Sequence, residues 1–282
     1  MAARIGQREN DGGDGPENGL QTFAQELKAQ REAAGLTQEQ LAKLMGYSTS
    51  VIAKLETCRA IPAPQHAEQA DGALRAPGTF RRLRTAAVNG AYEDWVRAYL
   101  DIEERATVLR SWQPLVMDGL LQTEAYARAI LRAARPGDSD IEVDRLVMAR
   151  MARQQIWERQ NPQPPILSVI LGEAVLRQQV GDAAVMGDQL ARLIEDARNP
   201  RITIQVMPFA AGAHPGLVGP FVVASFDTSM DAAYLDNALT GHVTERRKEV
   251  ARVTLLYDTL RSEALSPGAS AEYIARVVAE WT

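Results

Sequence analysis

Apolar positions recur every three or four residues between positions 20 and 56, which predicts three short amphipathic helices. They are Leu20, Phe23 and Leu27 in the first helix, Leu41, Leu44 and Met45 in the second, and Val51, Ile52 and Leu55 in the third. Gly35 and Gly46 interrupt the pattern where helices end, since glycine adopts the left-handed cap conformation without strain. The second and third helices are therefore joined by a turn of about three residues.

Polar residues at the predicted helix starts support this interpretation. Thr37 and Gln40 have the spacing of a capping box, and Ser48 suits the N-cap of the third helix. Two helices joined by so short a turn are typical of a helix-turn-helix, whose second helix enters the DNA major groove. The open face would then carry candidate DNA contacts at Ser48, Thr49, Ser50 and Lys54, with Gln38 over the phosphate backbone.

In the second half of the chain, the spacing of apolar residues changes from that of helices to that of strands. Apolar or β-branched runs at 166–171, 202–207, 221–226 and 232–236 predict four strands, the last two able to form a hairpin across "DTSMD". Helices are expected at 79–111, near 123–134, and at 140–159, 172–180, 183–198, 243–264 and 270–281. We expect a mainly α protein with a five-helix DNA-binding domain and an α+β domain with a small sheet of about four strands. The expected boundaries are a disordered tail at 1–19, a DNA-binding domain at 20–78 and an effector domain at 79–282.

Composition narrows the class of protein. The chain has 282 residues, 46% hydrophobic and 24% charged, which is typical of a soluble globular protein with two domains. No apolar run predicts a membrane helix or a signal peptide, and one cysteine excludes an internal disulfide, so a cytoplasmic location is expected. Cys58 could be a redox switch or an inert thiol. Three scattered histidines predict neither a metal site nor a cofactor.

The charge is unevenly distributed, although the whole chain carries −5. Residues 21–90 hold nine basic and six acidic groups, a balance of +3, whereas residues 91–282 hold 20 basic and 26 acidic groups, a balance of −6. The positive balance thus falls on the segment expected to touch DNA.

The stretch "LTQEQLAKLMGYSTSVIAKLE" resembles the Xre family of helix-turn-helix domains, through "TQEQLA", the glycine before the turn and "I-x-x-L-E". The resemblance implies base contacts from Thr49, Ser50 and Lys54, and phosphate contacts from Gln38 and Arg59. One departure is Thr57-Cys58, where the family usually has Asn-Gly or a similar pair, which leaves the position of Arg59 open.

Residues of about 80–265 resemble a domain of unknown function that follows Xre domains in actinobacterial regulators. The shared marks are "GLLQTEAYAR", "RMARQQI", "LGEAVLRQQVG", "QVMPFAAGAHPGLVGPFVVASF" and "EALSP". The likeness implies an antitoxin-like regulator encoded beside a small partner protein, and it supplies no catalytic residues. We expect a homodimer on an inverted-repeat operator. Its interface would be supplied by aromatic residues of the second domain, which could instead close the core of that domain: Trp95, Tyr99, Tyr257, Tyr273 and Trp281.

The glycines and prolines of "AGAHPGLVGPF", residues 211–221, are explained by a conformationally fixed connection to the next strand without any ligand, and this explanation is favoured. The alternative is a contact surface for a partner or ligand, through His214 and Phe221. Glu173 and Asp236 follow predicted strands and could face this loop. The chain has no nucleophile elbow, phosphate loop or dinucleotide fingerprint, so no catalytic site is expected. Three interpretations remain: a regulator that senses a protein, a regulator that senses a small molecule, and an enzyme with a DNA-tethering domain. The first is preferred.

Overall fold

The computed structural model describes residues 16–89, 94–159, 163–237 and 240–281, and it divides into two compact units, Met1–Ala91 and Tyr92–Thr282. Each unit is described by itself. The expected tail at 1–19 lies mostly outside the described residues, and the first helix already begins at Pro16.

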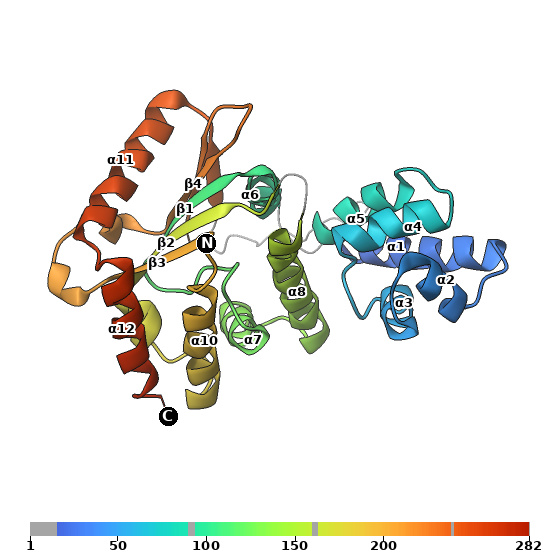
Figure 1. Ribbon diagram of the computed structural model, residues 1–282, viewed down its shortest axis with the longest axis horizontal. Coiled ribbons are helices and arrows are strands. Elements are labelled where there is room, and N and C mark those ends of the chain that lie inside the picture. Colours follow the sequence, from blue (N-terminus) through green and yellow to red (C-terminus); the bar gives the residue numbers. More distant parts are fainter. Residues whose placement is uncertain (1–15, 90–93, 160–162, 238–239, 282) are drawn as a thin grey trace, which may run out of the picture. The chain divides into compact units, whose positions relative to one another are not determined.

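Five helices make up the described part of the first unit (Figure 1). They are α1 (Pro16–Ala33), α2 (Gln38–Met45), α3 (Thr49–Glu56), α4 (Pro64–Ala73) and α5 (Thr79–Asn89). Phe23 of α1 meets Phe80 of α5 edge to face, with ring centroids 5.5 Å apart, and both rings are fully buried. Gly19 permits the same close approach, since a Cβ there would lie 2.5 Å from the carbonyl oxygen of Ala86. The expected boundary after residue 78 falls between α4 and α5, and α5 packs with the helices that precede it.

The local signals around α2 appear in the structure as expected. Thr37 and Gln40 form a reciprocal capping box, and Gly46 ends the helix in the left-handed region at φ 77°. The buried side of α2 consists of Leu41, Ala42 and Met45, whereas Leu44 is 58% exposed. The expectation that Leu44 belongs to the buried stripe is therefore wrong. The buried face of α2 is narrower than the apolar pattern of its sequence indicates.

The described residues of the second unit form one mixed sheet in the order β3-β2-β1-β4-β5-β6. Its strands are β1 (Val108–Gln113), β2 (Ile166–Gly172), β3 (Ile202–Met207), β4 (Phe221–Ser225), β5 (Ala232–Asp236) and β6 (Gly241–Thr244). The first three strands are parallel to one another, and β4, β5 and β6 continue the sheet antiparallel. The predicted β4–β5 hairpin is confirmed.

The sheet has six strands, so the expectation of about four is wrong. Residues 108–111 were expected within a helix, yet they belong to β1, the strand that joins the parallel and antiparallel halves through β2 and β4. Residues 243–244 were also expected to be helical and instead end β6, and α11 begins at Arg247. Both strands owe their state to backbone pairing with distant segments, which a local pattern does not contain.

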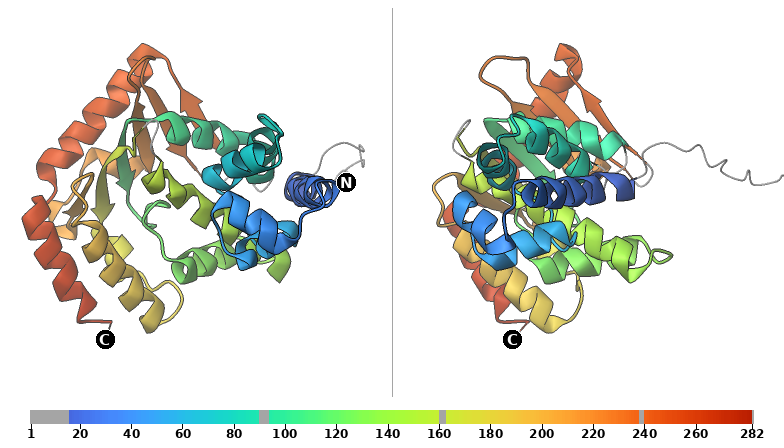
Figure 2. Two further views of the ribbon diagram at one scale, coloured as in Figure 1. Left: turned by 45° about the vertical axis from the view of Figure 1, so that its right-hand side comes forward. Right: turned by 90° about the vertical axis from the view of Figure 1, so that its right-hand side faces the viewer.

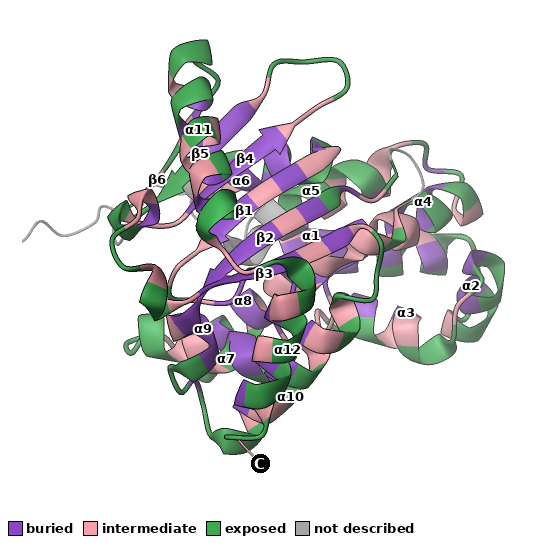
Figure 3. Ribbon diagram, turned by 60° about the vertical axis from the view of Figure 1, so that its left-hand side comes forward, coloured by how far each residue is buried: buried purple, intermediate pink, exposed green. Residues whose placement is uncertain are grey.

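Helices cover both faces of the sheet. They are α6 (Asp94–Arg105), α7 (Glu124–Ala134), α8 (Asp140–Arg153), α9 (Glu173–Arg177), α10 (Ala183–Asp196), α11 (Arg247–Glu263) and α12 (Pro267–Val278). In Figures 1 and 2, α11 lies along one side of the sheet and α6 lies on the other. The strands between them are largely buried, while the outward turns of α11 are exposed (Figure 3).

Successive side chains of β1 point to opposite faces of the sheet. Trp112 packs with Phe221 and Tyr257 in the core beneath α11, while Ser111 points to the opposite face. Two of the aromatic residues expected at a dimer interface, Tyr99 and Tyr257, are instead buried within the unit. Trp281 donates its indole N–H to the carbonyl of Leu176. The side chain of Trp95 lies outside the described residues.

Candidate functional site

The N-terminal half of α3 presents polar side chains to solvent. Ser48, Thr49, Ser50 and Lys54 are all exposed, while Ile52 and Leu55 are buried against the unit's core. Ser48 occupies the N-cap position, but its side chain makes no capping hydrogen bond there, and the residue is exposed. Of the four exposed residues expected to touch DNA, Ser48 is thus the N-cap of α3 and the other three lie within the helix.

Glu56, the last residue of α3, ties three helices together. Its carboxylate accepts hydrogen bonds from Arg31 Nε at 2.6 Å and Arg31 Nη2 at 3.0 Å, and from Gln38 Nε2 at 2.8 Å. Arg31 also donates to the carbonyl of Leu36 at 2.8 Å, at the entry to α2. The hydrogen bonds that Arg31 donates to Glu56 raise the pKa of Arg31, and burial opposes that effect only in part, so the guanidinium stays charged. Gln38, expected over a phosphate, is therefore held by its amide nitrogen against Glu56.

Cys58 sets the exit from α3. Its φ is 56°, in the left-handed region, and the following amide of Arg59 donates to the carbonyl of Lys54 at 2.8 Å. The thiol lies 3.8 Å from the carbonyl of Leu20, and burial raises its pKa. A raised pKa lowers the thiolate fraction, which disfavours a redox role. Arg59 itself is exposed just beyond this turn.

In the second unit, His214 packs against the core instead of facing an open site. Its ring meets Trp112 edge to face at 5.4 Å, and its Nδ1 accepts from the amide of Gly216 at 3.2 Å. Trp112 donates its indole N–H to the carbonyl of Gly216 at 2.9 Å, and a Cβ on Gly216 would lie 2.6 Å from the indole. Gly216 of this loop therefore permits close packing on Trp112.

Glu173 lies at the start of α9, apart from His214. Its carboxylate accepts from Arg177 Nε at 2.6 Å and from the amide of Phe209 at 2.9 Å. Burial raises its pKa, but hydrogen bonds from Tyr273, Phe209 and Arg177 outweigh that effect, and the net pKa is lowered. Glu173 is thus an ionised anchor for the loop after β3.

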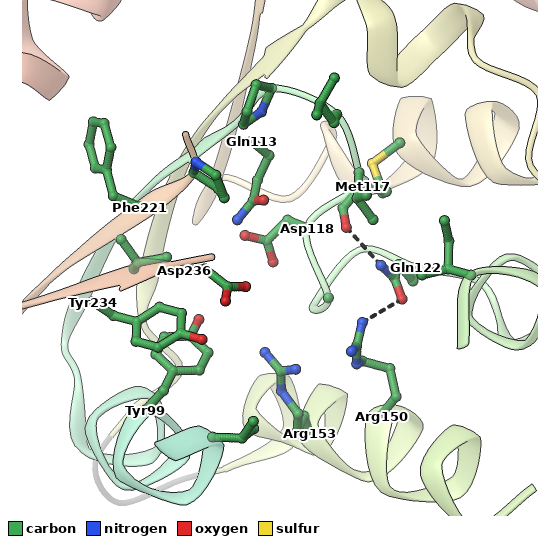
Figure 4. Close-up of a pocket in the computed structure, with 18 of the residues that line it drawn as sticks. Tyr99, Gln113, Met117, Asp118, Gln122, Arg150, Arg153, Phe221, Tyr234 and Asp236 are labelled. Carbon is green, nitrogen blue, oxygen red and sulfur yellow. Dashed lines mark hydrogen bonds between the residues drawn. The ribbon is translucent and has the colours of Figure 1, made fainter. Parts of the chain in front are cut away.

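Phe221 and Asp236, by contrast, both line one cavity of about 560 Å³ on the α6 side of the sheet (Figure 4). The ring of Phe221 points away from the polar side chains of the cavity and belongs to the core beneath α11. The walls come from α6, the segment after β1, α8 and the adjoining ends of β4 and β5. The structure therefore brings together two of the four residues expected in this unit, and it separates His214 and Glu173 from them.

A buried carboxyl forms one wall of this cavity. Asp118 is 4% exposed, and it accepts from Ser111 Oγ at 2.7 Å and from the amide of Leu120 at 2.9 Å. Burial raises its pKa, and the two hydrogen bonds only partly oppose that effect. On the rim, burial likewise raises the pKa of Asp236, which accepts a hydrogen bond from Tyr234.

Two arginines from α8 form the opposite wall. Arg153 donates from Nε and Nη2 to Glu103 at 2.9 and 2.8 Å, and its guanidinium lies 5.5 Å from the ring of Tyr99. Tyr99 donates its hydroxyl to Glu103 at 2.7 Å. Arg150 donates to Gln122 Oε1 at 2.9 Å, and Gln122 in turn donates to the carbonyl of Met117.

Sequence reasoning missed Asp118, Arg150 and Arg153 as members of a site. A signal was present, because "GLLQTEAYAR" and "RMARQQI" contain Gly119, Gln122 and both arginines. These stretches were recognised as family marks without a role. Only the folded unit shows that Asp118, Arg150 and Arg153 line a common cavity.

Comparison with known proteins agrees with the two units. Residues 22–84 match a family described as a helix-turn-helix domain, and residues 96–276 match the domain of unknown function DUF5753. No curated protein and no solved structure matches the chain in the corresponding searches. No helix among the described residues has the length and apolarity needed to cross a bilayer, and these residues contain no group of three or more potential metal ligands.

A helix-turn-helix domain indicates a DNA-binding regulator rather than an enzyme. The second match spans well over half of the sequence. The chain therefore belongs to the DUF5753 family, with a helix-turn-helix domain at its N-terminal side.

Proposed function

We propose that this protein is a sequence-specific transcription regulator, a repressor of the antitoxin-like type, that binds duplex DNA through α3. The observation that carries the proposal is the exposed polar stretch of Ser48, Thr49, Ser50 and Lys54 on a helix whose buried side is fixed by Ile52 and Leu55. Short hydroxyls and a long cation at a helix start suit base edges and phosphates. The local balance of +3 over residues 21–90 favours the same partner.

A competition gel shift with the full chain tests this proposal. Labelled DNA from the region upstream of the protein's own gene should be retained at physiological salt against excess random duplex, because specific sites bind about 10³-fold or more tighter than non-specific DNA. Footprinting should then show two protected half-sites about one helical turn apart. Equal competition by random and upstream DNA would count against sequence-specific binding.

We further propose that the protein acts as a homodimer, since two copies of α3 are needed to read an inverted repeat. Tyr99 and Tyr257 are buried within their own unit, whereas Tyr273 and Trp281, also expected at the interface, are partly exposed. Sedimentation of the full chain with and without operator DNA measures the stoichiometry directly. One chain per operator at saturating concentration would refute the dimer.

A small protein partner is the preferred effector. Phe209, Leu217 and Val218, in the loop between β3 and β4, are 64%, 70% and 84% exposed, which is an apolar surface suited to a protein contact. The balance of −6 over residues 91–282 favours a basic or neutral partner. Leu217→Ser should weaken the partner's effect on DNA binding, whereas Leu255→Ser on α11 is the matched control, because Leu255 is 66% exposed. An unchanged response in the Leu217 variant would remove this loop from the interface.

Sensing of a small molecule is the second candidate, and the cavity lined by Asp118, Arg150 and Arg153 is the observation that favours it. Its volume of about 560 Å³ lies within the ordinary range for ligand sites. The two candidates use different surfaces of the second unit, so variants of one surface leave the other available for test.

A further inference from the structure

Groups of both charge signs face the same space inside the second unit. Figure 4 shows the carboxyl groups of Asp118 and Asp236 and the guanidinium of Arg153 turned toward one cavity, with Arg150 beside them. A cavity lined only by arginines would suit an anion, and one lined only by carboxylates would suit a cation. The mixed lining favours a ligand that carries both charges.

The acidic wall is held in place from behind. Asp118 accepts one hydrogen bond on each carboxylate oxygen, from Ser111 Oγ and from the amide of Leu120, so its orientation is set before a ligand arrives. Tyr234 stacks on Tyr99 with ring centroids 4.3 Å apart, next to Asp236. Carboxylates beside aromatic rings are a favourable environment for an ammonium group.

The basic wall is equally fixed. Glu103 holds Arg153 through two hydrogen bonds, and Gln122 holds Arg150. Gly119 permits both arginines to approach the chain, because a Cβ there would lie 3.0 Å from Arg153 Nη1 and 3.3 Å from Arg150 Cδ. Preorganised guanidinium groups bind a carboxylate with little loss of side-chain entropy.

The remaining wall is apolar, with Val96, Leu115 and Ile130 among its residues. A ligand of matching chemistry has an apolar body between its two charged ends. With about 560 Å³ available, the cavity accommodates more than a single amino acid.

We propose that this cavity binds a small zwitterion with an apolar body, of the chemical class of an apolar dipeptide, with its ammonium toward Asp118 and Asp236 and its carboxylate toward Arg150. The proposal specifies the ligand of the sensing candidate above. It concerns binding to the second unit, which is measured without DNA.

The test measures the melting temperature and calorimetric binding of the full chain with leucyl-phenylalanine as the probe. The free dipeptide should raise the melting temperature, and either N-acetylation or C-terminal amidation should weaken binding about tenfold, the cost of losing a charge-assisted hydrogen bond. No binding at millimolar concentration, or equal binding of the free and capped forms, would overturn the proposal.

Two variants assign the ends of the ligand. Asp236→Asn should weaken the preference for the free amine, because Asp118 alone would then face it, and Arg150→Gln should abolish the preference for the free carboxylate. Asp188→Asn and Arg198→Gln are matched controls, since both residues are exposed on or after α10 and outside the cavity lining. Asp236 is itself exposed, so its variant should fold even if the Arg150 variant does not. An unchanged preference for the free amine in a folded Asp236→Asn protein would also overturn the proposed orientation.

The same protein preparations are then tested for DNA binding without dipeptide. If these preparations do not bind DNA specifically, the proposed role as a transcription regulator is refuted, whereas the measured binding of the dipeptide is unaffected. Binding of the dipeptide is decided by the calorimetry alone.

Discussion

At the scale of single residues, the exit from α3 shows how one side chain adapts to a backbone requirement. Cys58 takes the left-handed conformation, at φ 56°, that glycine or asparagine usually supplies after a helix. An L-residue with a Cβ pays about 1–2 kcal/mol for this conformation. The position is therefore occupied by a residue that does not favour it, and the turn persists because Arg59 and Lys54 close it with a backbone hydrogen bond.

Replacing Cys58 with glycine should raise the free energy of unfolding of the first unit by about 1 kcal/mol, because the strain is removed. Urea denaturation followed by circular dichroism measures the change. Cys58→Ala is the matched control, since it removes the thiol and keeps the Cβ. A gain in the alanine variant as large as that in the glycine variant would attribute the effect to the thiol instead of the backbone.

At the scale of elements, α1, α2 and α3 are joined by one buried ionic group. The Glu56 side chain is 3% exposed and that of Arg31 is 9% exposed, and their hydrogen bond is 2.6 Å long. Removal of one partner from such a pair leaves a buried charge without compensation. The orientation of α3 therefore depends on a contact that lies outside its exposed polar side.

Glu56→Gln should destabilise the first unit by about 3 kcal/mol, because Arg31 would remain charged and buried. Chemical denaturation measures this loss. Glu32→Gln is the matched control, since Glu32 also contacts Arg31, at 3.4 Å, but its side chain is 56% exposed. Similar losses of unfolding free energy in the two variants would show that burial does not determine how strongly each glutamate stabilises the unit through Arg31.

Lys54→Ala tests the exposed side of α3. We expect a loss of about 1–3 kcal/mol in binding to the preferred DNA if Lys54 reads a base edge, and a uniform loss over all sequences if it contacts phosphate. Titrations at several salt concentrations distinguish the two. Lys248→Ala is the control, because Lys248 is an exposed lysine at the start of α11 in the second unit. Unchanged affinity and unchanged salt dependence in the Lys54 variant would remove α3 from the groove.

At the scale of the whole molecule, two differently charged units carry the two parts of the proposed function. The first unit has a compact helical core and exposes its polar α3 surface, whereas the second unit builds a sheet with a charged cavity on one side. The second unit holds a buried carboxyl, Asp118, whose pKa is raised by burial. The stability of the chain should therefore depend on pH through this group.

The folded state binds the proton of Asp118 more tightly than the unfolded chain, where its pKa is about 3.9. The stability due to this proton is complete below about pH 4 and is lost as the pH rises through the folded pKa. Asp118→Asn keeps the group neutral, so its melting temperature should rise relative to the unaltered protein between about pH 4 and pH 7. Asp188→Asn, on the exposed side of α10, should show no such trend. A constant difference at all pH values would contradict this role of Asp118.

The sequence by itself determined the elements whose signals are local. The capping box of Thr37, the left-handed Gly46 and the inward positions of Ile52 and Leu55 are all present within about twenty residues of one another, and all four appear in the structure. The β4–β5 hairpin was predictable for the same reason, since its two strands are close neighbours along the chain.

The tertiary structure alone decided the features that depend on distant segments. Strand β1 forms because residues 108–113 pair with β2 on one side and β4 on the other. The cavity unites Tyr99, Asp118, Arg153 and Asp236 from four segments, and no period along the chain relates them. Backbone pairing and side-chain packing between such segments are cooperative, so their outcome is a property of the folded unit and cannot be read from any one stretch of its sequence.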